Sequence, residues 1–295
     1  MIFRRAFFIA ALFFGAFFWS AWPGQAFTIQ PLRYRVTIDP GRSTTVRVTV
    51  LNDETMPRRF RASVAGVEQD DAGRPLFGTS FDIAEEWVKP DINTFFLGPG
   101  EKKAVTFTVS APPRADPGSH FLALIIESSS AKTGAVGLTA RVAALLSLAV
   151  SGVVEETVSI DRFASVARLS ASGEWPLEAV LKNRGTVSVK PDGALIVKNA
   201  LGQIVAGQPV SFGVSLLPQA VRMVAPKIEL DRAKVRLPGW YTVNLAVHYG
   251  LSKSVVEAQA TVWYFPPWFI VAIGISLTGI LFLLLLKKYH SKKQV

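Results

Sequence analysis

The chain has 295 residues, with 32 lysines and arginines against 22 aspartates and glutamates, so its formal net charge is +10, and it contains no cysteine. The absence of cysteine excludes disulfides, a thiol nucleophile and a thiolate metal site. Stability must therefore come from core burial, for which the length suffices if the chain forms two domains of ordinary size.

The first 26 residues have the pattern of a secretory signal peptide. MIFRR supplies two arginines, AFFIAALFFGAFFWSAW is apolar, and the small residues Gly24 and Ala26 occupy the positions that a signal peptidase requires. We predict cleavage after Ala26. The alternative is an uncleaved anchor, because the apolar run approaches the length of a spanning helix.

Residues 27–152 are predicted to form a first immunoglobulin-like domain. Apolar and polar residues alternate through 45–51 and 104–110, which places the apolar side chains on one face of each strand. Both segments follow a Pro-Gly turn, in 39-DPGRSTTVRVTVLN-52 and in 98-GPGEKKAVTFTVSAP-112. We interpret the repeated phrase as two strands at similar levels of one sandwich, with a shared sheet as one possible arrangement, and not as a repeated binding site.

Two longer runs of the first domain are almost wholly apolar, at 121–126 and 142–150. A helix is an alternative for the second run. The neighbouring turn signals and short alternating segments favour buried central strands in an antiparallel sandwich.

Residues 153–264 are predicted to form a second sandwich of the same kind. The stretch 177–207 is typical of strands separated by Asn-Arg-Gly, Pro-Asp-Gly and Leu-Gly turns, and 238–250 begins with another Pro-Gly. Tyr241, Val243, Leu245 and Val247 should share one face of a strand. The predicted fold class is thus all-β, with two tandem immunoglobulin-like β-sandwiches before a single transmembrane helix.

That helix is predicted at 265–287, followed by a cytoplasmic tail at 288–295. Trp268 to Leu286 form 19 uncharged residues, about the ~20 that cross a bilayer. Trp263, Tyr264, Phe265 and Trp268 provide interfacial aromatics at its outer end, and Lys287 and Lys288 begin a tail of four lysines without an acid. The pattern predicts a type I single-pass protein of the cell membrane with residues 27–267 outside the cytoplasm.

The basic charge lies mainly in these targeting segments. Arg4, Arg5 and the four tail lysines account for six of the 32 basic residues, which leaves 26 against 22 acidic residues, or +4, for the exported part. Nucleic acid is therefore not expected as a partner. An exported chain without cysteine also indicates a bacterial source.

The sequence offers little for catalysis. Of the three histidines, His290 lies in the tail, while His120 and His248 fall in different domains, so no histidine zinc cluster is expected. No GxSxG, HExxH or P-loop spacing occurs. The acid pairs 70–71, 85–86 and 155–156 are interpreted as charges of solvated turns or sheet edges, because adjacent strand residues point to opposite faces and are poorly placed to form a carboxylate dyad. We predict a protein that is not an enzyme and that needs no cofactor or metal.

Two features could bind a partner. The segment 81-FDIAEEWVKPDINTFFLGPG-100 combines charge with aromatic residues, and we take Trp87, Phe95 and Phe96 as candidate ligand-binding residues. Trp87 is either part of the core or, if exposed, an anchor for a sugar or a peptide. The second feature is the set of open sheet edges, to which a partner can add a strand.

The order of parts resembles that of the bacterial WxL-interacting proteins, which have a signal peptide, two immunoglobulin-like domains, a transmembrane helix and a short lysine-rich tail. The phrases DPGRSTTVRVTVLN and LGPGEKKAVTFTVSAPPRADPG resemble their first domain. The resemblance implies peptidoglycan attachment by the first domain and binding of WxL-domain surface proteins by the second. The strand pattern is also similar, more weakly, to that of periplasmic pilus-assembly chaperones.

Three hypotheses follow. The main one is a non-catalytic, membrane-anchored envelope adaptor that binds peptidoglycan, envelope proteins or both, and it predicts protected edges with an exposed aromatic or polar patch. The alternative is a tethered periplasmic chaperone that donates an edge strand to exported subunits, and it predicts an apolar unpaired edge or a cleft. An exported hydrolase would need acids or histidines that converge in a cleft.

Overall fold

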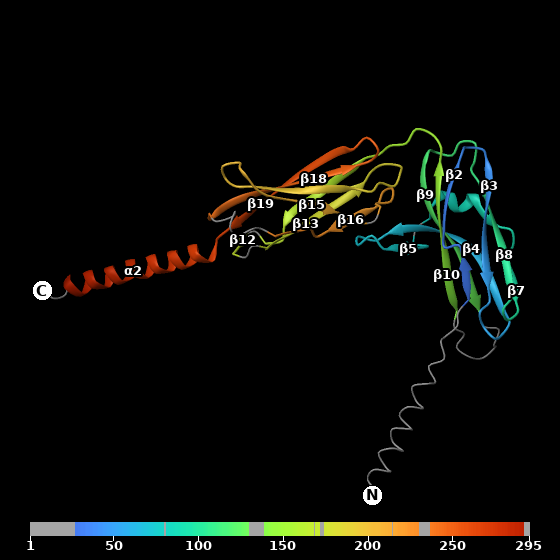
Figure 1. Ribbon diagram of the computed structural model, residues 1–295, viewed down its shortest axis with the longest axis horizontal. Coiled ribbons are helices and arrows are strands. Elements are labelled where there is room, and N and C mark those ends of the chain that lie inside the picture. Colours follow the sequence, from blue (N-terminus) through green and yellow to red (C-terminus); the bar gives the residue numbers. More distant parts are fainter. Residues whose placement is uncertain are drawn as a thin grey trace, which may run out of the picture.

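The computed structural model describes residues 27–79, 81–129, 139–167, 169–171, 174–213, 215–229 and 237–291 of the chain. It contains two β-sandwiches in succession and a long C-terminal helix, which extends from the end of the second sandwich away from the first (Figure 1). This confirms the predicted fold class. The predicted signal peptide and its cleavage at Ala26 lie outside the described residues.

The first sandwich is built from two sheets. One has the order β1-β3-β8-β6 and the other β2-β10-β9-β4-β5, with β7 paired to β4. The strands are β1 (Thr28–Gln30), β2 (Arg33–Ile38), β3 (Ser43–Leu51), β4 (Arg58–Gln69), β5 (Pro75–Phe77), β6 (Val88–Pro90), β7 (Thr94–Leu97), β8 (Lys102–Ser110), β9 (Gly118–Ser129) and β10 (Ala140–Val150), with a 3-10 helix η2 (Ile83–Trp87) before β6.

The second sandwich repeats this two-sheet plan. One sheet has the order β11-β13-β16, with β17 paired to β13, and the other has the order β12-β19-β18-β14-β15. The strands are β11 (Val158–Ser165), β12 (Leu169–Ser170), β13 (Glu174–Asn183), β14 (Asp192–Lys198), β15 (Ile204–Ser211), β16 (Val221–Val224), β17 (Lys227–Glu229), β18 (Gly239–Tyr249) and β19 (Ser254–Tyr264). Residues 151–157 connect the two sandwiches, and the predicted boundary at 152/153 falls within this connection.

The two Pro-Gly phrases lead to neighbouring strands of one sheet. β3 pairs with β8 along its whole length, with Val46 opposite Phe107 and Val48 opposite Val105. All four of these side chains are buried in the core of the first sandwich. Gly41 and Gly100 have φ of 76° and 71°, the left-handed conformation that glycine adopts without a steric penalty. The prediction of strands at similar levels is confirmed, and the structure places them in the same sheet.

Both long apolar runs are strands, as expected. β9 lies between β10 and β4 in the interior of its sheet, and β10 pairs with β9 over eleven residues. The antiparallel prediction needs one correction. β2 pairs with β10 in parallel, and so does β12 with β19, because each short strand follows a change from one sheet to the other.

The second core also follows the predicted alternation. Tyr241, Val243, Leu245 and Val247 are all buried, on one face of β18. They pack with Trp175, which is fully buried and whose ring centroid lies 5.3 Å from that of Tyr241. Because successive strand residues point to opposite faces, the alternate residues of β18 lie on its other face, where Trp240 is exposed and the others are half-buried.

The helix α2 (Pro267–Ser291) covers the predicted transmembrane segment. Within the described residues it is the one helix long and apolar enough to cross a membrane, over Pro267–Leu285. Trp268 lies in its first turn and is exposed, and the predicted anchor residues Leu286, Lys287 and Lys288 lie in its last turns.

Candidate functional site

The two sandwiches meet at an elbow that is held by hydrogen bonds. Gln69, the last residue of β4, donates from Nε2 to the Ser215 carbonyl oxygen at 2.9 Å and accepts from Leu217 N at Oε1, at 3.1 Å. Ser119 N also donates to the Thr186 carbonyl oxygen, at 2.9 Å. One glutamine side chain thus satisfies a backbone donor and a backbone acceptor of the other sandwich, which ties both sandwiches at a defined angle.

The turn between β4 and β5 reinforces the elbow. Met223 N in β16 donates to the Asp71 carbonyl oxygen at 2.9 Å. Arg222 is buried, with its guanidinium bonded to the Phe212 and Ser215 carbonyl oxygens. A Cβ at Gly73 would lie 2.3 Å from Arg222 Nη2, so the close approach of this turn to the guanidinium requires glycine. The hairpin of the first sandwich therefore packs on the sheet of the second.

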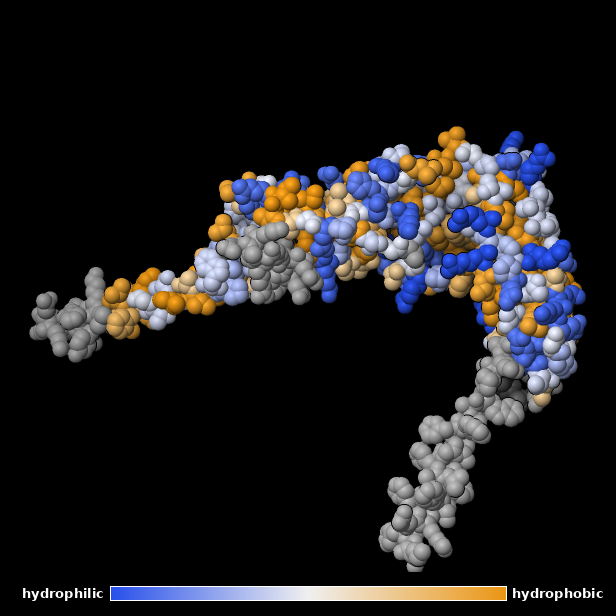
Figure 2. Space-filling view, in the orientation of Figure 1, coloured by the Kyte–Doolittle hydropathy of each residue, from blue (hydrophilic) through white to orange (hydrophobic). Residues whose placement is uncertain are grey.

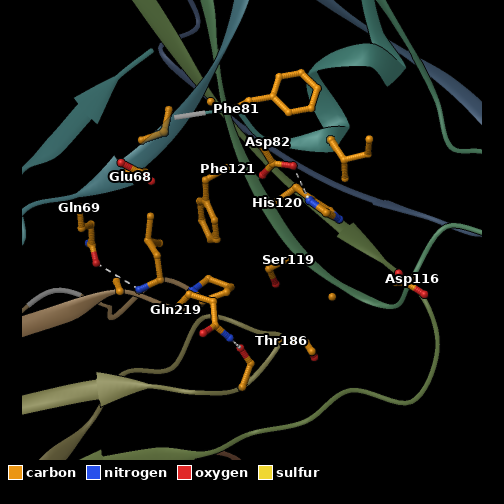
Figure 3. A pocket seen from close by; sticks show the side chains of 18 of the residues that line it. Glu68, Gln69, Phe81, Asp82, Asp116, Ser119, His120, Phe121, Thr186 and Gln219 are labelled. Carbon is orange, nitrogen blue, oxygen red and sulfur yellow. Dashed lines mark hydrogen bonds and ion pairs between the residues drawn. The ribbon is translucent and has the colours of Figure 1, made fainter. Parts of the chain in front are cut away.

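A cavity of about 690 Å³ lies on one side of the elbow (Figure 3). Residues of η2, β4 and β9 form its upper wall in this view, and Thr186 and Gln219 of the second sandwich form its lower wall. Its charged lining is acidic, with one histidine: Glu68, Asp71, Asp82, Asp116 and His120. An acidic cavity at the joint disfavours anionic ligands on this side.

His120 and Asp82 form the main polar contact in that cavity. His120 Nδ1 lies 2.8 Å from Asp82 Oδ1, and the His120 ring meets Trp87 edge to face at 5.0 Å between centroids. Asp82 also accepts from Ala84 N at 2.9 Å, while the Glu85 side chain accepts from Asp82 N at 3.0 Å. This is a capping box, which satisfies the free donors at the start of η2. The histidine therefore fixes the short helix to β9.

The pKa of Asp82 reflects this environment. Burial by itself raises the pKa of this carboxyl, but the hydrogen bond from His120, the bond from Ala84 N and the charge of His120 outweigh it, so the pKa is lower than usual. A lowered carboxyl pKa stabilises the folded state above the unfolded value, and that contribution is lost as the pH falls through the folded value.

We therefore expect Asp82→Asn to reduce stability at pH 5 and to matter less at lower pH. The difference in the free energy of unfolding between wild type and Asp82→Asn should shrink as the pH falls below about 3.9, the usual carboxyl value. Urea unfolding at a series of pH values measures it. Asp116→Asn, an exposed carboxylate of the same cavity, is the control. A difference that stays constant down to about pH 2 would contradict the proposed contribution of the pair.

A second cavity, of about 920 Å³, lies against the outer face of the sheet that contains β2, β10 and β9. Its opposite wall comes from five residues of the second sandwich: Ser188, Lys190, Gly213, Ser215 and Leu217. Its charged lining consists of Arg33, Arg35 and Lys190, and among the described residues no acidic side chain lines it. Three cations facing one cavity attract carboxylates or other anions, in contrast to the acidic side of the elbow.

Beside this second cavity, part of β10 has an unpaired edge. β2 covers β10 from Leu145 onward, and among the described residues no strand pairs with Ala140–Ala144 on that side. Leu145 N donates to the Leu32 carbonyl oxygen at 2.9 Å, so the odd-numbered residues of β10 direct their backbone groups to this side. Arg141 and Ala143 therefore present N–H and C=O groups along an edge of about 17 Å.

Most side chains of this open edge are small or apolar. Ala140, Val142 and Ala143 are half-buried, Ala144 is buried, and Arg141 is the one charged residue of the five. Arg141 is paired with Glu127 of β9, with its Nε 2.6 Å from the carboxylate. Natural sheet edges are commonly protected by charged side chains, especially lysines, by prolines or by bulges. Arg141 is the one such feature among Ala140–Ala144, and its charge is paired with Glu127.

The candidate binding residues of the 81–100 segment divide between core and surface. Phe95 is buried, with its ring stacked on Phe60 at 5.5 Å, so its side chain serves the core rather than a ligand. Trp87 is half-buried and packs against the same core. Phe96 is 67 % exposed, with Arg59 6.0 Å from its ring centroid. The cause is the alternation of β7, which directs adjacent phenylalanines to opposite faces.

The three acid pairs lie outside the strands, and the turn position expected for residues 70–71 is confirmed. Residues 70–71 lie in the β4–β5 turn, 85–86 in η2 and 155–156 in the connection between the sandwiches. Glu85 is used in the capping box and in a bond from Gly66 N. Among the described residues no group of three or more acids or histidines is placed to hold a metal ion, and no hydroxyl is bonded to His120.

Sequence reasoning missed the groups that build the elbow. Asp82 and Glu85 have the spacing of a capping box, which could have indicated η2. Gln69, His120 and Arg222 carry no local signal, because their partners lie far away in the chain: Gln69 and Leu217, for example, are separated by 148 positions.

The chain matches no family model and no curated protein sequence. It is similar in fold to solved structures of pilus chaperones. The class 5 fimbriae chaperone CfaA has a TM-score of 0.44 at 12% identity, with 80% of this chain and 99% of that chain covered. The E. coli chaperone DraB has a TM-score of 0.38 at 12% identity, covering 80% and 96%. A CsuC–CsuE chaperone–tip adhesion subunit pre-assembly complex from Acinetobacter baumannii has a TM-score of 0.37 at 13% identity, covering 68% and 91%.

These similarities concern the fold alone. They agree with the weaker of the two resemblances seen in the sequence, that to pilus-assembly chaperones. The resemblance to WxL-interacting proteins stays a prediction.

Proposed function

We propose that this protein is a membrane-anchored, non-catalytic binding protein of the bacterial envelope that holds an extended segment of an exported partner protein. The observation that carries the proposal is the unpaired edge of β10 at Ala140–Ala144. A segment added beside Arg141 and Ala143 would continue the ladder that β2 forms with the rest of β10, and main-chain hydrogen bonds would provide its affinity. This is the chaperone-like alternative that the sequence offers, in preference to the wall adaptor.

The cationic cavity supports a preference for acidic groups in the partner. β2 begins at Arg33, opposite Leu145, where the open edge ends. A segment on the edge would therefore finish close to Arg33 and Arg35, both of which line the cavity. A carboxylate of the partner, from a side chain or a chain end, would gain charge-assisted hydrogen bonds there.

The helix α2 supports the anchoring part of the proposal. Its apolar stretch Pro267–Leu285 has the length of a membrane span, and it follows the second sandwich after two residues. Together with the signal peptide predicted at the N-terminus, this supports a location of both sandwiches outside the cytoplasm. Such an anchor would keep the partner near the membrane surface during export or assembly.

The proposal is tested by blocking the edge with proline. Ala143→Pro removes an N–H that points away from β9 and places a ring on the open edge, and proline is tolerated at such edge positions. We expect recovery of envelope proteins on the immobilised full-length chain to fall on the order of tenfold, since a net backbone hydrogen bond is worth about 1 kcal/mol and the ring adds a steric clash.

Thr45→Pro is the matched control. Asn52 N donates to the Glu101 carbonyl oxygen, so even-numbered residues of β3 face β8, and Thr45 directs its N–H to an uncovered edge of the other sheet. This variant should bind as the wild type does. Equal recovery by wild type and Ala143→Pro would refute binding at the β10 edge.

Peptidoglycan binding is a second candidate, favoured by one observation. Phe96 is exposed beside Arg59, and an exposed aromatic ring can stack on a sugar. Purified peptidoglycan belongs in a parallel arm of the same experiment. Retention of peptidoglycan by wild type and Ala143→Pro, with loss in Phe96→Ala, would identify the protein as the wall adaptor instead.

A further inference from the structure

One end of the second sandwich carries a cluster of exposed apolar side chains. We call them the apolar rim: Val166, Leu169, Leu201, Leu237, Trp240 and Trp263. Their exposed fractions lie between 42 % for Trp263 and 79 % for Leu201. Orange, hydrophobic surface is visible at this end of the sandwich beside the helix in Figure 2. Clustered exposure of large apolar side chains indicates an interaction surface.

Strand register shows that these residues share one end. Trp263 near the end of β19 lies opposite Trp240 on β18 and next to Leu169 on β12. Lys198 lies opposite Thr242, so the β14–β15 turn that contains Leu201 projects beyond the same end. The turn at the other end of β18, which contains Leu251, faces the first sandwich instead (Figure 1).

The connection between the apolar rim and α2 is short. β19 ends at Tyr264 and the helix begins at Pro267. Phe265 N donates to the Ser170 carbonyl oxygen at 2.9 Å, so the sheet bonding continues into the connection. Aromatic rings follow it closely: Trp240 meets Trp263 at 5.6 Å, Trp263 stacks on Phe265 at 6.3 Å, and Phe265 stacks on Phe269 at 6.1 Å. These contacts restrict the orientation of the second sandwich relative to the start of the helix.

Membrane dimensions then determine where the rim lies. The 19 residues Pro267–Leu285 make a helix of about 28 Å at ~1.5 Å per residue, close to the ~30 Å of the hydrocarbon core. The start of α2 therefore lies at the boundary of that core, beneath a headgroup layer of about 5–7 Å. Trp263 is four residues earlier, at most about 13 Å along an extended chain.

From this geometry we propose that the apolar rim docks into the headgroup layer of the membrane that α2 spans. Tryptophan favours this layer, where its ring is partly shielded from water and its N–H remains hydrogen-bonded. Residues from three strands and three connecting segments would then contact the bilayer in addition to the helix. The second sandwich would hold a fixed tilt, and the first sandwich, at its far end in Figure 1, would present the β10 edge at a set distance from the lipid.

The chain has no native cysteine, so a thiol-reactive label attaches only to a cysteine introduced by substitution. An environment-sensitive fluorophore is attached to the introduced cysteine of Leu201→Cys, Leu251→Cys or Leu277→Cys in the full chain. Each labelled protein is then reconstituted in phosphatidylcholine vesicles with or without brominated lipid. Leu201 and Leu251 are matched controls for each other, since both are highly exposed turn leucines at opposite ends of one domain. Leu277 lies inside the proposed span.

We expect quenching by brominated lipid and a blue-shifted emission at position 201, strong quenching at 277, and neither effect at 251. The inference rests on the membrane anchoring that is part of the proposed function. Position 277 reports on the anchoring alone, so it distinguishes a failure of the anchoring from a failure of the docking. Quenching at 277 with position 201 behaving like 251 would overturn the docking and leave the anchor intact. No quenching at 277 would overturn both.

Discussion

Phe95→Ala is expected to lower the free energy of unfolding of the first sandwich by about 3–5 kcal/mol, the usual cost of removing a buried phenylalanine ring. Phe95 is 4 % exposed and its ring stacks on Phe60, which in turn meets Phe27 edge to face at 5.2 Å. The truncation leaves a cavity among rings that cannot close over it. Urea unfolding of the full chain in detergent, followed by circular dichroism, measures the loss.

Phe96→Ala provides a control of the same residue type at the next position. Phe96 is 67 % exposed, and its contact with Arg59 is a surface cation–π pair, so the expected loss is about 1 kcal/mol or less. A similar loss in both variants would show that β7 does not alternate as described. A larger loss for Phe96→Ala would place Phe96 in the core in place of Phe95.

The second large effect is expected from Asn52→Ala, at about 3 kcal/mol. Asn52 is fully buried at the end of β3, and its Nδ2 donates to the carbonyl oxygens of Met56, Leu97 and Gly98 at 2.9–3.1 Å. Alanine removes the donor from these carbonyl groups, of which that of Leu97 is buried, and an unsatisfied buried group costs about 1–3 kcal/mol. The midpoint of urea unfolding of the first sandwich should fall accordingly.

The second sandwich also has a buried asparagine at the end of a strand that donates to backbone carbonyl oxygens. Asn183, at the end of β13, is fully buried and donates to the carbonyl oxygens of Val187 and Leu216 at 2.8 and 3.0 Å. Asn183→Ala should destabilise the second sandwich to a similar degree. Asn199→Ala, in the exposed β14–β15 turn, is the control and should cost less, because water replaces its bonds. Equal effects in all three variants would refute the role of burial.

The strands themselves were predictable because their signals are local. Alternation at 45–51, 104–110 and 238–250 predicted buried faces that the structure confirms, and the apolar run at 142–150 is a strand as expected. Each pattern depends only on the two-residue period of an extended chain and on the removal of apolar side chains from water.

The candidate binding residues were less predictable, because their burial depends on which distant strand they pair with and not on a local signal. The aromatic residues at 87, 95 and 96 are alike as sequence, yet one is half-buried, one is in the core and one is at the surface. Which face of β7 meets the core depends on its pairing with β4, where Phe60 lies opposite Phe95. A shift of one residue in that pairing would exchange the two phenylalanines.

The sequence by itself determined the all-β class, the strand periods and the apolar C-terminal segment, since each follows from composition and short-range pattern. Only the tertiary structure decided which strand edge stays unpaired, which cations share a cavity and which exposed apolar residues gather beside α2. Those features depend on contacts between residues far apart in the chain, such as Gln69 with Leu217 and Leu145 with Leu32. Their geometry exists only once both sandwiches have closed, because local preferences do not specify which distant groups will meet.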